Sequence, residues 1–226
     1  MEIGALIFPN IDQMDFTGPF EVLSRLRGAR IHVFSKSLTP IRDTAGLILT
    51  PTVTLAEAPP LDVLLVPGGR GQLALMDDGE VLEFLAKPVS WIFSVCTGAL
   101  TCGAAGLLKG KRATTHWNSF HLLPYFGAIP VDERVVIDGN LITTAGVSAG
   151  IDGALRLATL LGGEAVARRI QLDIQYVPEP PFALTPGEFL EAKLQQDVSK
   201  LTSARVESAK LAAARLGIDG IGIDVK

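Results

Sequence analysis

Short apolar runs alternate with amphipathic stretches along the first 160 residues of the chain. A short apolar run bounded by polar or glycine-rich residues is typical of a buried strand, and apolar residues at every third or fourth position are typical of a helix. We expect buried strands at residues 3–8, 31–35, 62–66 and 90–95, and a hairpin at 133–146. Helices are expected at residues 17–26, 79–86, 98–108, 148–162 and 163–176. Strands separated by helices indicate a mostly parallel sheet covered on both faces.

Local signals refine three of these segments. Thr17 stands where the N-cap of the first helix is expected, because its hydroxyl can accept a hydrogen bond from a first-turn amide. Asp138-Gly139 predicts the turn of the hairpin, since this dipeptide readily adopts positive φ angles. Residues 46–55 are expected to be extended or to form a hairpin of their own.

The pattern changes after Tyr176. Residues 177–187 are rich in proline and exclude a regular element, whereas residues 188–217 follow a long helical pattern with an incomplete apolar face. Such a helix is expected to pack across the body of the protein or a partner subunit. Its solvated face is expected to include Arg205, Glu207 and Lys210. The last nine residues, from Ile218, are expected to form a loose tail.

The length of 226 residues suits one α/β domain with an arm, and a content of 48% apolar and 19% charged residues allows a real core. We expect an α/β domain at residues 1–176, followed by a linker, the long helix and the tail at 177–226. A net charge of −4 offers no basic surface for nucleic acid. Neither a signal peptide nor an apolar run of about 18 residues is evident, so a cytoplasmic location is expected.

The stretch "SVCTGAL", residues 94–100, places Cys96 directly after an expected buried strand. A strand that turns at once into a helix presents this side chain at the ligand-binding edge of the sheet, as in a nucleophile elbow. Gly98 and Ala99 leave room for such a turn, and the helix N-terminus is expected to lower the pKa of the thiol. The alternative is a buried, unreactive cysteine, which is what we expect of Cys102 inside the following helix.

Two more segments are expected at the same edge of the sheet. Asp15 follows the first strand, so its carboxyl group could hydrogen-bond the cysteine sulfur and act as acid or base, or else belong to the helix cap. Glu21 lies further along this helix and is a weaker candidate for the acid. The loop "PGGRG", residues 67–71, could offer backbone amides to an anion, although it lacks the lysine and the hydroxyl residue of a P-loop.

Four stretches, in this order, resemble the ThiJ/PfpI superfamily: "FPNIDQMDFTGPFEVL", "LLVPGGRG", "SVCTGALTCGAAGLLKGKRATTHW" and "ERVVIDGNLITTAGVSAGID". The resemblance spans residues 1–176 and implies a flavodoxin-like three-layer α/β sandwich with a nucleophile elbow, to which the C-terminal helix is added. Within the superfamily, "DFTGP", "SVCTGA", "LLKGKRATTHW" and "GVSAGID" are most similar to the isocyanide hydratase branch.

This branch adds water to an isocyanide, R–N≡C, to give an N-formamide, without a metal or organic cofactor. The resemblance implies that a Cys96 thiolate attacks the isocyanide carbon while Asp15 supplies a proton, which gives a thioimidate. Asp15 then activates water, and the thiolate leaves as the formamide forms. Thr97 is expected to position Asp15 or the sulfur.

The resemblance also implies the walls of the site and the assembly. Residues expected to line the substrate pocket are Gly69, Arg70, Val147, Trp117 and His116. A structural role for His116 and core packing for Trp117 remain open. Thr97 stands where PfpI-type proteases carry a histidine, so no Cys–His pair is expected there, and Ala145 stands where glycine is familiar. A homodimer is expected, with no metal, nucleic acid or membrane partner.

Two other functions use the same residues. The thiolate could attack an aldehyde, as in glyoxalase or deglycase chemistry on reactive dicarbonyls. A non-enzymatic ligand-sensing or redox-sensing module is the third reading, because an activated thiolate can be oxidised. The chain shows no helix-turn-helix with basic recognition residues, which a DNA-binding regulator would need.

Overall fold

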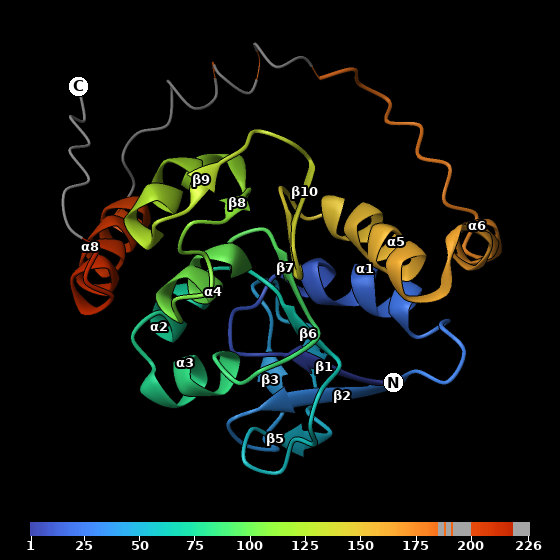
Figure 1. Ribbon diagram of the computed structural model, residues 1–226, viewed down its shortest axis with the longest axis horizontal. Coiled ribbons are helices and arrows are strands. Elements are labelled where there is room, and N and C mark those ends of the chain that lie inside the picture. Colours follow the sequence, from blue (N-terminus) through green and yellow to red (C-terminus); the bar gives the residue numbers. More distant parts are fainter. Residues whose placement is uncertain (185–187, 189–190, 192–199, 219–226) are drawn as a thin grey trace.

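A seven-stranded sheet forms the centre of the protein in the computed structural model, which describes residues 1–184, 188, 191 and 200–218 (Figure 1). The strand order is β10-β11-β7-β6-β1-β2-β5, and every pairing is parallel except that of β10 with β11. The strands are β1 (Glu2–Leu6), β2 (Arg30–Ser35), β5 (Val53–Thr54), β6 (Val63–Val66), β7 (Trp91–Val95), β10 (Val135–Asp138) and β11 (Leu141–Thr144). The predicted parallel sheet is therefore confirmed, and so is the hairpin around Gly139.

Helices cover both faces of this sheet (Figure 1). One layer contains α1 (Gln13–Leu23), α5 (Ala149–Gly162) and α6 (Glu164–Asp173). The other contains α2 (Gln72–Leu75), α3 (Gly79–Leu85), α4 (Gly98–Ala104), the 3₁₀ helix η1 (Trp117–Phe126) and α8 (Lys200–Arg215). The predicted three-layer α/β sandwich is confirmed. No helix in the described part of the chain is long and apolar enough to cross a bilayer.

Two short strand pairs lie outside the central sheet. β3 (Ile41–Arg42) pairs antiparallel with β4 (Ile48–Leu49), and β8 (Arg112–Ala113) pairs parallel with β9 (Ile129–Pro130). The segment 46–55 is extended, as expected, but it does not fold back on itself. Its first strand pairs with β3, whereas its second, β5, forms the edge of the central sheet beside β2.

The first helix begins earlier than its sequence suggests. Asp12, with an extended backbone, is the N-cap of α1, and its carboxylate accepts a hydrogen bond from the Met14 amide at 3.4 Å. Thr17 is inside the helix, where its hydroxyl donates to Gln13 Oε1 at 2.7 Å, so the prediction of Thr17 as N-cap is wrong. An acidic cap satisfies the first-turn amides as well as a hydroxyl does. Asp15 therefore lies in the first turn of α1, at the carboxyl end of β1.

Helix α8 packs against η1, α4 and α2. Its buried alanines are Ala209, Ala212 and Ala213. Arg205 is also buried, at 6% exposure, so its placement on a solvated face is wrong, although Glu207 and Lys210 are exposed as predicted. The expected tail and most of residues 185–199 lie outside the described residues, and the division at residue 176 stays a prediction.

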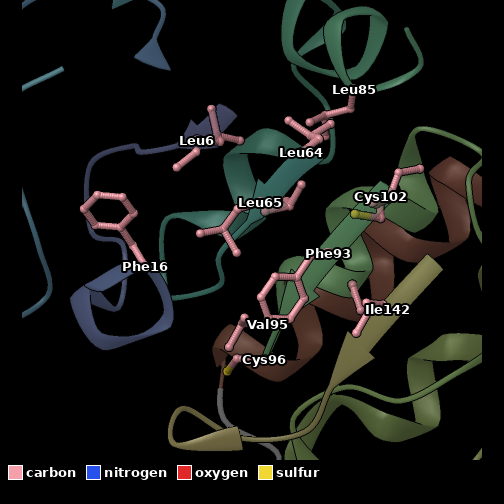
Figure 2. Packing of buried hydrophobic residues seen from close by; sticks show 14 of the residues in the cluster. Leu6, Phe16, Leu64, Leu65, Leu85, Phe93, Val95, Cys96, Cys102 and Ile142 are labelled. Atoms are coloured by element: carbon pink, nitrogen blue, oxygen red, sulfur yellow. The ribbon is translucent and has the colours of Figure 1, made fainter. Parts of the chain in front are cut away.

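The core is continuous through both helical layers. Strands β6 and β11 are buried at every position, because the sheet is covered on both sides. Figure 2 shows Phe93 and Val95 on β7 leading to Cys96, with Cys102 further along on α4. The elbow is thus anchored in the buried core of the molecule.

Candidate active site

Cys96 occupies a sharp turn between β7 and α4. Its φ angle is +56°, in the left-handed region that costs an ordinary residue roughly 1–2 kcal/mol. Two backbone contacts hold it there: its amide donates to the Thr144 carbonyl at 3.1 Å, and its carbonyl accepts from the Thr115 hydroxyl at 2.7 Å. Because the turn is fixed on both sides, the thiol points in one direction from the end of the strand, as the elbow prediction requires.

Asp15 is completely buried and lies beside Cys96, so the structure brings these two predicted residues together. Its Oδ2 atom accepts a hydrogen bond from the Gly68 amide at 3.0 Å. No hydrogen bond to its Oδ1 atom is found among the described residues. One carboxyl oxygen is therefore fixed by the backbone, and the other is available to exchange a proton.

The glycine loop closes against this pair. A Cβ atom on Gly68 would lie 2.6 Å from the Thr97 amide nitrogen and 2.9 Å from Asp15 Oδ2. Gly69 has a φ of +125°, and a Cβ there would lie 2.3 Å from the Asp12 amide nitrogen. Only glycine allows so close an approach. The Gly69 amide in turn donates to Thr97 Oγ1 at 3.1 Å, so the loop and the elbow brace each other.

Burial controls the protonation of both acids. The pKa of Asp15 is raised from 3.8 to about 7, mainly by burial and also by the nearby charge of Asp12, while the hydrogen bonds from Gly68 and Cys96 lower it. Burial also raises the pKa of the Cys96 thiol well above its ordinary value, and so does the charge of Asp15, while the Thr97 amide lowers it. The predicted lowering by the helix N-terminus is therefore wrong. Helix α4 has seven residues, and its contribution is outweighed by desolvation and the carboxylate.

The two groups hold a proton between them, because two adjacent negative charges are disfavoured in a buried site. A carboxylate beside a thiol can take the thiol proton at the moment the sulfur attacks an electrophile. It can then return that proton to the atom that needs it. The arrangement is suited to nucleophilic attack by sulfur coupled to proton transfer by Asp15.

The remaining predicted residues surround the elbow at different depths. Thr97 is buried and bonded to the glycine loop, whereas Arg70 is exposed on that loop. Val147 is half-buried in the turn after β11, three residues beyond the Thr144 carbonyl that binds the Cys96 amide. No direct contact between Val147 and the thiol is described.

His116 is the N-cap of η1. Its Nδ1 atom accepts a hydrogen bond from the Asn118 amide at 3.4 Å, and burial lowers the pKa of the ring. A neutral histidine with an occupied Nδ1 is suited to shaping a wall. The Trp117 ring lies against the His116 ring, with centroids 5.3 Å apart. A Cβ atom on Gly146 would lie 3.9 Å from Cδ2 of His116. His116 therefore connects η1 with the turn that carries Val147.

Glu21 is far less suited than Asp15 to act as the acid. It is exposed, and its carboxylate pairs with Arg25 one helical turn later. The sequence-based preference for Asp15 therefore agrees with the geometry.

Sequence reasoning missed Arg205. Its guanidinium lies close enough to Cys96, Arg70 and His116 for their charges to interact, and its Nη1 donates to Ser119 Oγ at 3.4 Å. The available signal was the spacing of Arg205 with Ala209 and Ala212. These positions form one helical stripe, and small residues mark the face of a helix that packs closely.

A separate groove of about 1810 Å³ lies between β10, α5, α6 and the segment that follows Tyr176. None of the predicted site residues lines it. Its lining includes Arg134 and Asp152, which form a salt bridge at 2.5 Å. The elbow and this groove are therefore different features of the surface.

The fold and the elbow define a class of α/β proteins in which a cysteine is presented at the carboxyl edge of a parallel sheet. Within this class, residues 1–160 match the DJ-1/PfpI family, and the chain belongs to that family.

Individual relatives extend the similarity. The chain is 44% identical over 225 residues to the isonitrile hydratase of Pseudomonas putida, an alignment that covers 96% of this chain and 99% of that protein. It is 26% identical to the glutathione-independent glyoxalase DJR-1.2 of Caenorhabditis elegans, over 60% of this chain and 75% of the relative. A crystal structure of a ThiJ/PfpI family protein from Pseudomonas syringae superposes with a TM-score of 0.85 at 39% identity, covering 94% of this chain and 90% of that one.

Proposed function

We propose that the protein is a cofactor-independent isocyanide hydratase, which converts R–N≡C and water into the formamide R–NH–CHO. The observation that carries the proposal is the 44% identity with an isonitrile hydratase along nearly the whole of both chains. Isonitrile and isocyanide are two names for the same functional group. The buried Asp15–Cys96 pair supplies the nucleophile and the proton carrier that this addition needs.

In the first step, the Cys96 sulfur forms a bond to the terminal isocyanide carbon. Asp15 takes the thiol proton and delivers it to the same carbon, which gives the thioimidate R–N=CH–S–Cys96. Sulfur and hydrogen both end on one carbon, so no proton enters from solvent. This is why a pair that shares one proton suits the step better than a free thiolate.

In the second step, water adds to the thioimidate carbon. Asp15, now a carboxylate, accepts a proton from the water, and this proton passes to the substrate nitrogen. The hydroxyl proton then passes through Asp15 to the sulfur as the carbon–sulfur bond breaks. The products are the formamide and the starting thiol, so the cycle consumes one water and changes no oxidation state.

The surrounding residues position the reactants in this proposal. Thr97 braces the glycine loop, whose Gly68 amide fixes Asp15 Oδ2. The Gly69–Arg70 backbone and Val147 provide further walls of the substrate pocket. His116 and Trp117 provide the wall from η1, with His116 neutral and held by Asn118.

The direct test is conversion of p-nitrophenyl isocyanide to its formamide by the purified protein, followed by absorbance and identified by mass spectrometry. Water labelled with ¹⁸O should place one label in each formamide. Trapped thioimidate on the peptide that contains Cys96 would support the covalent step. Absence of formamide with several isocyanides would overturn the proposal.

Glyoxalase activity is the second candidate, favoured by the similarity to the glutathione-independent glyoxalase of C. elegans. The same thiol would attack the aldehyde carbon of a dicarbonyl such as methylglyoxal. The identity is lower and the coverage smaller than for the hydratase. Comparison of kcat/KM for methylglyoxal and for an isocyanide on one preparation decides between the two.

We also propose that the protein works as a cytoplasmic homodimer, with residues 1–176 as the catalytic domain. Both cysteines are unpaired, which agrees with a reducing compartment. Light scattering coupled to gel filtration tests the assembly, and a single monomeric mass across working concentrations would contradict it.

A further inference from the structure

Among the residues that the structure describes, Arg205 is a buried cation without a carboxylate partner. Its exposure is 6%, and within the described ranges it donates a hydrogen bond to Ser119 Oγ at 3.4 Å. Its Nε atom is buried and unpartnered there, and no salt bridge to it is found in that part of the chain. Arginine stays charged inside proteins, and a buried charge without a partner is strongly destabilising. Such an arrangement indicates a residue kept for a ligand.

One neighbour of Arg205 is a second cation. Burial lowers the pKa of the guanidinium, Cys96 raises it, and the second cation, Arg70, lowers it further. Arg70 belongs to the glycine loop that closes over Asp15. This loop precedes the elbow in the sequence, whereas α8 follows it. Arg205 therefore lies within electrostatic reach both of the Cys96 thiol and of a second cation from a distant segment.

Other polar atoms without partners lie on the helices that α8 contacts. Gln72 on α2 has neither amide atom bonded, and Thr101 on α4 has an unbonded hydroxyl, among the described residues. Both side chains are completely buried. Helix α8 packs on α2 and α4 as well as on η1. The layer that holds Arg205 is thus richer in unmet hydrogen-bonding capacity than a closed core would be.

A simple alkyl or aryl isocyanide leaves these groups unmet. Its terminal carbon is used at Cys96, its nitrogen has no free lone pair, and its substituent is apolar. A carboxylate, in contrast, matches the planar fork of donors on a guanidinium and neutralises its charge.

We propose that Arg205 binds an anionic group, a carboxylate by preference, on the same substrate whose isocyanide carbon reacts at Cys96. The inference rests on the proposed hydratase function and adds the substrate class to it. The natural substrate is then an isocyanide that also carries a carboxylate, and α8 supplies the residue that selects it.

The test compares 4-isocyanobenzoate with its methyl ester, which carries a methyl group in place of the negative charge at the far end of the ring. Wild-type kcat/KM should favour the carboxylate by about 10- to 100-fold, the range expected of a charge-assisted hydrogen bond in a buried site. Arg205→Met should lose this preference and keep activity on the ester within about threefold. Arg205→Lys should retain part of the preference.

Lys210→Met is the matched control, because it removes an exposed cation from the same helix. It should leave the preference unchanged. Thermal unfolding of each variant shows that the fold is kept. Replacing a buried unpaired cation by methionine should not lower stability.

Two results would overturn the inference. One is equal turnover of acid and ester by the wild type. The other is an Arg205→Met variant that loses activity on both substrates equally and shifts the pH profile, because Arg205 would then act on the thiol and not on the substrate.

Binding of the products separates this inference from the proposed function. Calorimetry should give tighter binding of 4-formamidobenzoate than of its methyl ester, with the difference lost in Arg205→Met. Failure of both isocyanides to react would count against the hydratase, while this binding difference would still support the anion site. Equal binding of the two formamides would overturn the anion site whatever the turnover.

Discussion

The two cysteines of the chain lie six residues apart on the same strand–helix unit, and they differ in backbone conformation and in the groups beside them. Cys96 has a left-handed backbone, a buried carboxyl beside it and 7% exposure. Cys102 lies inside α4, is completely buried, and burial alone raises its pKa to about 12. Both thiols are therefore protonated at neutral pH. A lowered pKa is not what distinguishes the reactive cysteine from the inert one.

The difference lies in where the proton can go. Among the described residues, only burial and a backbone amide affect the pKa of Cys102, and no acid–base side chain contributes to it. Cys96 has Asp15, whose pKa of about 7 lets it accept and release a proton close to neutrality. A buried thiol thus becomes a nucleophile through its neighbour, which agrees with general base activation of weak nucleophiles.

The largest predicted effect compares the two cysteines directly. Cys96→Ala should lower isocyanide hydration by about 10⁴-fold or more, because the covalent route is removed. Cys102→Ala should change kcat by less than about threefold and cost roughly 1 kcal/mol of stability through lost packing. Full activity in Cys96→Ala, measured on protein with an unchanged circular dichroism spectrum, would break the comparison.

Asp15→Asn tests the proton acceptor. Hydration should fall by about 10²- to 10⁴-fold, the usual range for loss of a general acid–base. Wild-type kcat/KM should rise with pH through an apparent pKa of about 7, as the pair loses the first of its two protons. Asp15→Asn should lack this step.

The same variant should react differently with an alkylating agent. Since the charge of Asp15 raises the pKa of Cys96, its removal should speed reaction of that thiol with iodoacetamide at pH 8. A variant that is slower in both reactions would show that Asp15 promotes ionisation of the thiol, and would contradict the view that its charge raises the pKa of Cys96.

Asp15→Asn should also stabilise the protein. The folded pKa of about 7 lies above the unfolded value near 3.8, so the folded chain keeps a proton that the unfolded chain has released. This favours folding fully below pH 4 and is lost as the pH rises through 7, at a cost of up to about 4 kcal/mol. Urea unfolding at pH 8 should therefore show a more stable variant. The gap should close toward pH 4, and a gap independent of pH would contradict the assignment.

The smallest effect concerns the backbone of the elbow. Cys96→Gly should be more stable than Cys96→Ala by roughly 1 kcal/mol, because glycine adopts a φ of +56° without strain. Chemical denaturation of the two inactive variants measures this. A higher free energy of unfolding for Cys96→Ala than for Cys96→Gly would mean that residue 96 does not keep its positive φ angle in solution.

The sheet and the Asp15–Cys96 pair were accessible to sequence reasoning for a geometric reason. Parallel strands place their carboxyl ends at one edge, so residues that follow two such strands meet even when far apart in the chain. Protonation was not accessible in the same way. It depends on how completely Asp15 and Cys96 are desolvated, which is a property of the packed layers.

Arg205 shows a second limit of the sequence. Charged residues on a long helix are usually solvated, and its neighbours Glu207 and Lys210 are exposed in that way. Which stripe of α8 meets the body is decided by the complementary surface of η1, α4 and α2. That surface exists only after residues distant in sequence have folded together.

The contacts of Gly68 and Gly69 have a consequence for how such a protein can diversify. A single methyl group at either position would collide with backbone atoms of the elbow or of the turn before α1. Mutational scanning should find these positions intolerant of every replacement. New preferences among small molecules must then arise on the more permissive walls around His116, Val147 and α8, while the reacting centre is inherited unchanged.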